Sequence, residues 1–202
     1  MASYQHYRGA VLGPHGAGKT TMILKYLKIN KMPPATTCCI QHFMKREFGG
    51  NNNYFCITDT IGQESYSSVN KKFVQNSNLI IILIPAHDQN PCSTLQKAMK
   101  DARSVIDLKN CVISVFVSKS DLTQFKPEEM LHTLEQSCPK SCSMFKNADV
   151  KYYMISALSG NNNDEAINDT FDRFLSLVES KKIKAPLHCF DEEESPKSKC
   201  YI

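Results

Sequence analysis

The stretch 13-GPHGAGKT-20 decides how this chain folds. It fits the pattern GxxxxGK[ST], whose glycines let backbone N–H groups converge on phosphate oxygens while the lysine offers its ammonium. The pattern also stands in the required context, because residues 7–12 predict a strand before it and residues 19–30 predict a helix after it. A loop of this kind serves ATP and GTP alike. We therefore predict phosphate contacts, with the Thr20 hydroxyl also coordinating magnesium, from His15, Gly16, Ala17, Gly18, Lys19, Thr20 and Thr21.

The rest of the chain alternates between strand and helix patterns. Two continuous apolar runs, residues 79–85 (LIIILIP) and 111–117 (CVISVFV), predict central strands buried on both faces of a mostly parallel sheet. Residues 41–48 and 54–59 flank a glycine and asparagine turn and predict an antiparallel hairpin. With a last strand at residues 152–155, this gives an α/β fold of the P-loop NTPase type: a mostly parallel six-stranded sheet with one antiparallel strand, flanked by helices on both faces. Further helices are expected at residues 93–107, 127–137 and 164–180.

Length and composition indicate one globular domain. With 42% hydrophobic and 22% charged residues in 202, the chain resembles neither a disordered nor a membrane-embedded protein. The net charge of +4 is too small and too scattered to indicate nucleic-acid binding, and neither a leader nor a span-length apolar run is present. We expect a cytoplasmic domain over residues 1–180 and a flexible tail over residues 181–202, where charged residues replace the apolar periodicity. The nine dispersed cysteines are expected to be reduced thiols.

Three further motifs carry a family resemblance. Residues 59–64 (DTIGQE) differ at one position from the DTAGQE segment of Ras and Rab proteins, residues 118–121 (SKSD) resemble NKxD, and residues 156–158 (SAL) resemble SAK. On these motifs the chain resembles, over residues 7–180, the Ras-like superfamily of small GTPases, in a divergent Rab-like form. The resemblance implies a G domain that binds GTP or GDP with Mg²⁺ and hydrolyses GTP slowly without an activating protein.

The same resemblance implies roles around the third phosphate. Gln63 would be the catalytic residue that orients the attacking water, Asp59 would support magnesium through water, and the amide of Gly62 would contact the third phosphate. Thr36 and Thr37 compete for the switch threonine that reaches both magnesium and this phosphate. Thr37 is favoured because it stands 22 residues before Asp59, as in Ras-like proteins.

The remaining motifs predict the guanine site. The carboxylate of Asp121 can accept hydrogen bonds from both the ring N–H and the amino group of guanine, and the stem of Lys119 can lie over the base. Backbone amides at Ser156 and Ala157 would bind the guanine oxygen. Ser118, which replaces the family asparagine, is expected to lose contacts to the phosphate loop, and this predicts weaker binding or faster exchange than in a typical Rab protein.

Two functions of different classes follow. Gln63, with the complete phosphate motifs, favours a GTP-hydrolysing switch in vesicle-mediated membrane traffic, controlled by an exchange factor, an activating protein and effectors. His15, which can crowd the glutamine, together with Ser118 and Leu158, favours a nucleotide-locked scaffold that scarcely hydrolyses. A P-loop kinase of small molecules ranks third, because it would not need the DTIGQE and SKSD pair.

Branch and membrane attachment stay open. The step of 17 residues from Thr20 to Thr37 resembles Arf proteins, whereas DTIGQE resembles Ras and Rab proteins. Cys200 stands third from the end, so prenylation there, with attachment to the cytosolic face of endomembranes, competes with an unmodified cytoplasmic chain. Residues 136–149 are expected to form a surface insertion of unknown use.

Overall fold

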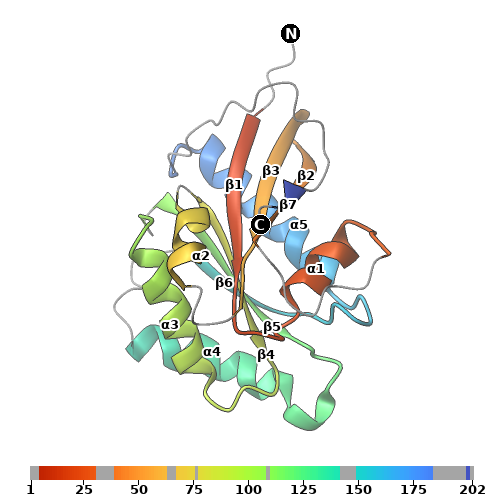
Figure 1. The fold of residues 1–202 in the computed structure, drawn as a ribbon, viewed down its shortest axis with the longest axis vertical. Coiled ribbons are helices and arrows are strands. Elements are labelled where there is room, and N and C mark those ends of the chain that lie inside the picture. The colour runs from red at the N-terminus through yellow and green to blue at the C-terminus, as the bar shows by residue number, and fades with distance from the viewer. Residues whose placement is uncertain are drawn as a thin grey trace.

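The computed structural model describes residues 5–30, 39–62, 67–75, 77–107, 110–141, 149–183 and 199–200. These residues form a twisted sheet with helices on both faces, as the alternating pattern predicts (Figure 1). The helices are α1 (Lys19–Tyr26), α2 (Ser67–Val74), α3 (Pro91–Arg103), α4 (Pro127–Ser141) and α5 (Asn163–Glu179), and a short 3₁₀ helix, η3, lies at Thr123–Phe125. None of the described helices combines the length and apolar composition that crossing a membrane requires.

The sheet has the strand order β6-β5-β4-β1-β3-β2-β7. Neighbouring strands from β6 to β3 are parallel, whereas β2 pairs with β3 in the antiparallel sense. The predicted α/β fold with a mostly parallel six-stranded sheet is confirmed, and two residues of β7 add to its edge beside β2. The strands are β1 (Gln5–Leu12), β2 (Ile40–Phe48), β3 (Asn51–Asp59), β4 (Leu79–Pro85), β5 (Val112–Ser118), β6 (Asp149–Met154) and β7 (Lys199–Cys200).

The sheet separates two apolar cores. On one side, aromatic residues of α5 such as Phe171 and Phe174 pack on Phe55 of β3 and on α1. On the other side, Leu95 of α3 and Leu134 of α4 pack against buried residues of the central strands, such as Ile82 and Val115. Strands β4 and β5 are buried along their whole length, which explains why their sequences are continuously apolar.

Several element boundaries differ from the prediction. The hairpin turn is only Gly49-Gly50, with φ of 57° and 76°, so β3 begins at Asn51 and the asparagine run is part of the strand. Helix α1 ends at Tyr26 because Lys28, at φ 56°, has left the helical region. Helix α4 continues to Ser141, into the expected insertion, and α2 was missed because two turns are too short to show a clear periodicity.

The cysteines differ from expectation at one position. Cys39, Cys56 and Cys111 are buried free thiols. Burial raises the pKa of Cys111 to about 12, with Asp107 adding to the shift, so this thiol is unreactive at neutral pH. Cys92 is disulfide-bonded, and the expectation of reduced thiols throughout is therefore wrong there.

Candidate nucleotide site at the carboxyl edge of the sheet

The predicted motifs converge at one edge of the sheet. Parallel strands have their carboxyl ends at the same side of the sheet, and in this strand order β1 lies between β3 and β4, with β5 and then β6 beyond β4. The loop after β1, the DTIGQE segment after β3 and the SKSD segment after β5 therefore meet although they are far apart in sequence. The strands that end here close with Leu12, Asp59, Pro85, Ser118 and Met154.

The loop after β1 has a backbone that only glycine can adopt. Gly13 has φ of 140°, and a Cβ atom there would lie 2.4 Å from the carbonyl oxygen of Leu83 in β4. Gly16 and Gly18 also have positive φ, at 72° and 93°. Gly18 precedes α1 without a side-chain cap, so the first N–H groups of the helix stay available to an anion.

Lys19 lies inside this loop and is only 6% exposed. Its Nζ atom donates to the carbonyl oxygens of Gly13 and Pro14, both at 3.0 Å. Burial lowers the pKa of the ammonium, and the nearby Asp59 carboxylate opposes that shift. An ammonium carries three protons, so one remains for a ligand in the loop.

Thr20 and Asp59 form a buried pair. The Thr20 hydroxyl donates to Oδ2 of Asp59 at 2.6 Å, and the other carboxylate oxygen, Oδ1, is buried without a hydrogen-bond partner among the described residues. Burial raises the pKa of Asp59 to about 6, against the opposing effects of the Thr20 hydrogen bond and of Lys19. A buried carboxylate oxygen without a partner among the described residues, beside a threonine hydroxyl oxygen, is the kind of donor set that Mg²⁺ takes.

Gly62 lies directly against the phosphate loop. A Cβ atom on Gly62 would be 2.6 Å from the backbone nitrogen of His15 and 2.7 Å from Nζ of Lys19. The structure therefore brings this glycine to the loop as the motif predicts, while the His15 side chain is exposed. Gln63 and Thr37, the predicted catalytic and switch residues, lie outside the described residues, and their roles stay predictions.

The guanine motifs meet beside the same loop. Ser118, buried at the end of β5, donates through Oγ to the carbonyl oxygen of Ala17 at 2.7 Å. Ser118 therefore keeps one direct contact to the phosphate loop, and the weaker binding or faster exchange expected from the replacement of asparagine stays a prediction. Lys119 follows with φ of 59°, and Asp121 is exposed at the mouth of the site.

The hydrogen bond between the side chains of Ser156 and Asp121 is not predicted by the motif. The prediction used only the backbone of Ser156 and Ala157, but the Ser156 hydroxyl donates to Oδ1 of Asp121 at 2.5 Å and accepts from the Ser159 amide at 3.1 Å. The two hydrogen bonds of the Ser156 hydroxyl fix the carboxylate that the motif predicts for the base. Leu158, at the position of the family lysine, is 79% exposed.

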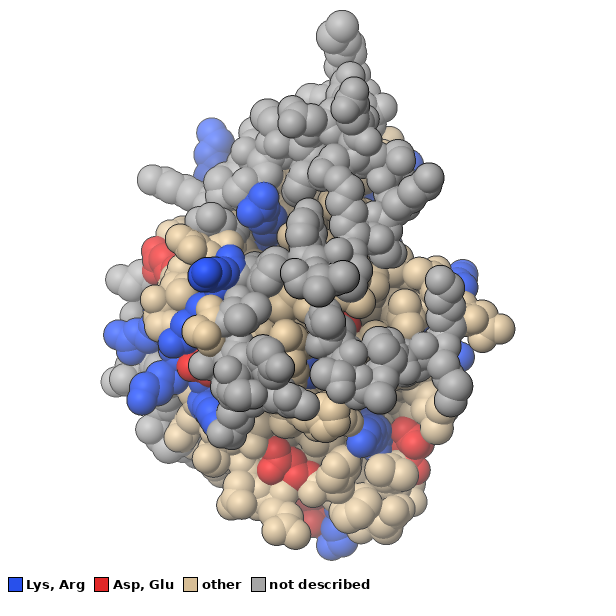
Figure 2. All heavy atoms as spheres, in the orientation of Figure 1, with Lys and Arg blue, Asp and Glu red and all other residues tan. Residues whose placement is uncertain are grey.

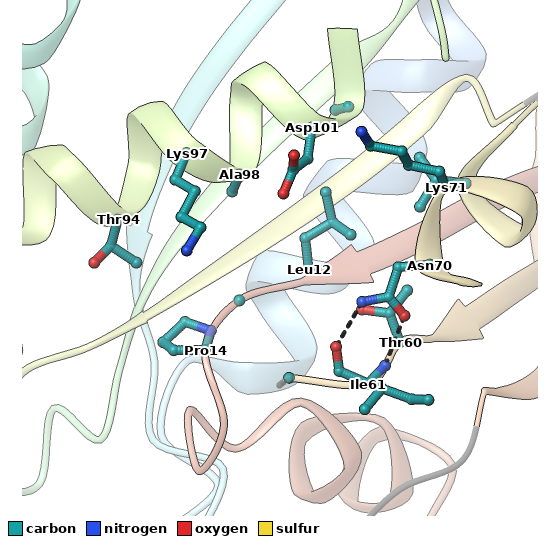
Figure 3. A pocket seen from close by; sticks show the side chains of 14 residues that line it. Leu12, Pro14, Thr60, Ile61, Asn70, Lys71, Thr94, Lys97, Ala98 and Asp101 are labelled. Carbon is teal, nitrogen blue, oxygen red and sulfur yellow. Dashed lines mark hydrogen bonds between the residues drawn. The ribbon is translucent and has the colours of Figure 1, made fainter. Parts of the chain in front are cut away.

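A second missed residue lies on α2. The side-chain amide of Asn70 makes hydrogen bonds to the backbone of Ile61, one residue before Gly62 (Figure 3). No local signal marks it, because Asn70 belongs to no motif and stands in a helix that the sequence pattern does not reveal.

With the geometry established, the comparison with known families is decisive. The sequence model of the Ras family matches residues 8–176. The chain belongs to the Ras family. This Ras-family protein is therefore a small GTPase with GTP hydrolase chemistry, as the motifs predict.

Individual relatives of this Ras-family protein are distant. Translation initiation factor IF-2 of Ureaplasma parvum is 25% identical over 175 residues, which are 87% of this chain and 27% of that factor. Ras-related protein Rab-11B of Dictyostelium discoideum is 26% identical over 178 residues, 85% of this chain and 75% of that protein. ADP-ribosylation factor-like protein 5A of Rattus norvegicus is 22% identical over 124 residues, 61% of this chain and 68% of that protein. This chain thus spans about a quarter of the length of IF-2.

Proposed function

We propose that this Ras-family protein is a Rab-like switch that binds and hydrolyses GTP to regulate vesicle-mediated membrane traffic. The observation that carries the nucleotide part is the meeting of Lys19, the Thr20–Asp59 pair and Gly62 at one sheet edge. These groups supply a cation, a metal-binding oxygen pair and a backbone amide within one loop cluster. Such a cluster suits the charges of a nucleoside triphosphate.

Thr20 and Asp59 are the described residues that would hold magnesium. The Thr20 hydroxyl gives its proton to the hydrogen bond with Asp59, so its oxygen could coordinate the ion, and Oδ1 of Asp59 could accept a hydrogen bond from a water on the ion. The described residues contain no cluster of three or more His, Cys, Asp or Glu side chains suited to a metal, which leaves room for phosphate oxygens and water as further ligands. When bound, the ion neutralises charge on the phosphate oxygens.

Asp121 is proposed to select guanine. Its two carboxylate oxygens can accept from the ring N–H and the amino group of guanine, a donor pair that adenine does not present. The Ser156 hydroxyl holds one of these oxygens in position before the base arrives, which reduces the ordering cost of binding.

The Rab-like assignment rests on sequence proximity. The match to Rab-11B covers 85% of this chain, against 61% for the ADP-ribosylation factor-like protein. DTIGQE and the distance from Thr37 to Asp59 point to the same branch. We extend the proposal to a site of action on the cytosolic face of endomembranes, with Cys200 as the attachment point.

A regulatory partner would find a positive surface beside Gly62. Blue Lys and Arg side chains gather over α2 and α3 in Figure 2, although the net charge of the whole chain is only +4. An exchange factor, activating protein or effector with an acidic contact face would be attracted there. The basic residues of these two helices are Lys71, Lys72, Lys97, Lys100 and Arg103.

A nucleotide-locked scaffold is the second candidate. The backbone of His15 lies beside Gly62, so a ligand that draws the imidazole inward would crowd the position of the attacking water. This reading predicts tight GTP binding with little turnover.

Single-turnover phosphate release from GTP with magnesium tests both candidates. The native chain is compared with Gln63→Leu, with ATP as the control nucleotide and binding measured in parallel. GTP-selective release that disappears in the variant supports the switch. Binding without release, even with an added activating protein, supports the scaffold, and failure to bind GTP would overturn both.

A further inference from the structure

Asn70 joins three segments of the chain: its own helix α2, the residues after β3 and the residue before β2. Its Nδ2 atom donates to the carbonyl oxygen of Ile61 at 2.6 Å, and the Ile61 amide donates back to Oδ1 at 3.1 Å. The thiol of Cys39, just before β2, donates to the same Oδ1 at 3.5 Å. One side chain of α2 thus binds both polar groups of one residue after β3 (Figure 3) and also contacts the residue before β2.

The segment between Asp59 and Gly62 is held at two successive residues. Thr60 donates through Oγ1 to the carbonyl oxygen of Val11 in β1 at 2.6 Å, which fixes it to the sheet. Asn70 fixes the next residue, Ile61, and Gly62 follows against Lys19 and His15. The orientation of the Ile61–Gly62 peptide, and so the direction of the Gly62 N–H, therefore depends on the Asn70 side chain.

The surroundings explain why this contact matters. Ile61 borders a cavity of about 170 Å³ between α2 and α3 whose walls include Leu12, Val74 and Ala98. These three side chains cannot hydrogen-bond to a peptide group, and the polar lining residues Thr94, Lys97 and Asp101 belong to α3, on the other side of the cavity from α2. A partly buried peptide group that lacks a partner is costly. Asn70 supplies both partners from the side of α2 (Figure 3).

We propose that Asn70 is a positioning residue that holds the Gly62 amide ready for the third phosphate and so favours GTP over GDP. The inference rests on the proposed function, since it assumes that GTP occupies the loop beside Lys19. GDP lacks the phosphate that Gly62 would contact. The loss of Asn70 therefore weakens GTP binding and leaves GDP binding nearly unchanged.

The test compares affinities for a non-hydrolysable GTP analogue and for GDP in the native full chain, Asn70→Ala and Asn70→Asp. We expect the ratio of the two affinities to shift against the analogue by about tenfold in Asn70→Ala. In Asn70→Asp a carboxylate oxygen faces the Ile61 carbonyl, so the shift should be at least as large. Single-turnover hydrolysis should slow in both variants while GDP release stays unchanged.

Asn78→Ala is the matched control. Asn78 also uses its Nδ2 atom to bind a backbone carbonyl, that of Asn110 at 3.0 Å. It precedes β4, however, and so lies at the amino ends of the parallel strands, away from the candidate site. Its loss should lower stability without changing the ratio. An unchanged ratio in both Asn70 variants, with the native chain binding both nucleotides, would overturn the role of Asn70 alone. Failure of the native chain to bind either nucleotide would overturn the proposed function with it.

Discussion

On the phosphate side of the site, Lys19, Thr20 and Asp59 are buried and held within the loop and strand ends, whereas on the base side Asp121 is exposed and held by one hydroxyl of Ser156. The phosphate side keeps its motif intact because backbone geometry and glycine leave little freedom there. The base side departs from the family motif at Ser118 and Leu158, and the short side chains of Ser118 and Ser156 make the hydrogen bonds there. The difference shows that the phosphate side depends on a backbone conformation that only glycine adopts at Gly13, whereas the base side depends on side-chain hydrogen bonds of Ser118 and Ser156, which are buried as well.

The largest test of this contrast is Gly13→Ala. The new Cβ would lie 2.4 Å from a β4 carbonyl oxygen at a φ of 140°, so we expect a loss of at least about 3 kcal/mol in the free energy of unfolding. Gly50→Ala is the control, because Gly50 also has positive φ but has no atom within 4 Å of a new Cβ. Its cost should be about 1 kcal/mol. Urea denaturation of both variants measures the difference, and equal losses would contradict the steric argument.

Asp121→Asn tests whether Asp121 selects guanine on the base side. An amide in place of one carboxylate oxygen puts a donor against the donors of guanine, and we expect GTP affinity to fall on the order of 100-fold. ATP affinity should change little, so selectivity is lost. Equilibrium titration with fluorescent nucleotides measures both values. An Asp88→Asn variant, altered in the loop before α3, serves as the control.

Asp59→Asn separates stability from function on the phosphate side. A carboxyl group whose folded pKa is raised from 3.8 to about 6 destabilises the folded state progressively as pH rises through that window, and the cost persists above it. Without magnesium or nucleotide at pH 7.5, the variant should therefore be about 2 kcal/mol more stable than the native chain.

The same Asp59→Asn protein should lose the magnesium dependence of nucleotide binding. Thermal unfolding across pH 3.5 to 7.5, with a chelator present, measures the stability change, and the difference should shrink toward pH 4. Glu128→Gln, which alters an exposed carboxylate of α4, is the control. A variant no more stable than the native chain at pH 7.5 would contradict the assigned cost of burial.

Ser118→Ala is the smallest of these changes. Loss of the contact to the Ala17 carbonyl should raise the nucleotide off-rate by about fivefold, because one buried hydrogen bond between the two sides is removed. Ser114→Ala is the control, since Ser114 is also buried in β5 but bonds to Thr170, away from the site. Stopped-flow release of a fluorescent nucleotide measures the rates. Equal off-rates in Ser118→Ala and the native chain would show that the contact does not tie the two sides together.

Much of the fold could be predicted from local patterns. The apolar runs of β4 and β5 and the loop at 13–20 are sufficient to predict a mostly parallel sheet and the place of the phosphate loop. The missed element, α2, spans two turns, and the start of β3 was placed late because an asparagine run resembles a turn. In both cases packing against the sheet overrides a weak local preference.

The sequence by itself determined the phosphate loop, the alternation of strands and helices, and the family of this protein, because these depend on residue types at fixed short spacings. Only the tertiary structure decided that Ser118 reaches Ala17, 101 positions away, and that Ser156 holds Asp121, 35 positions away. Asn70 acquires its contact with Ile61 in the same way. Such contacts depend on strand order and on the docking of helices on the sheet, and a local sequence pattern does not specify either of them.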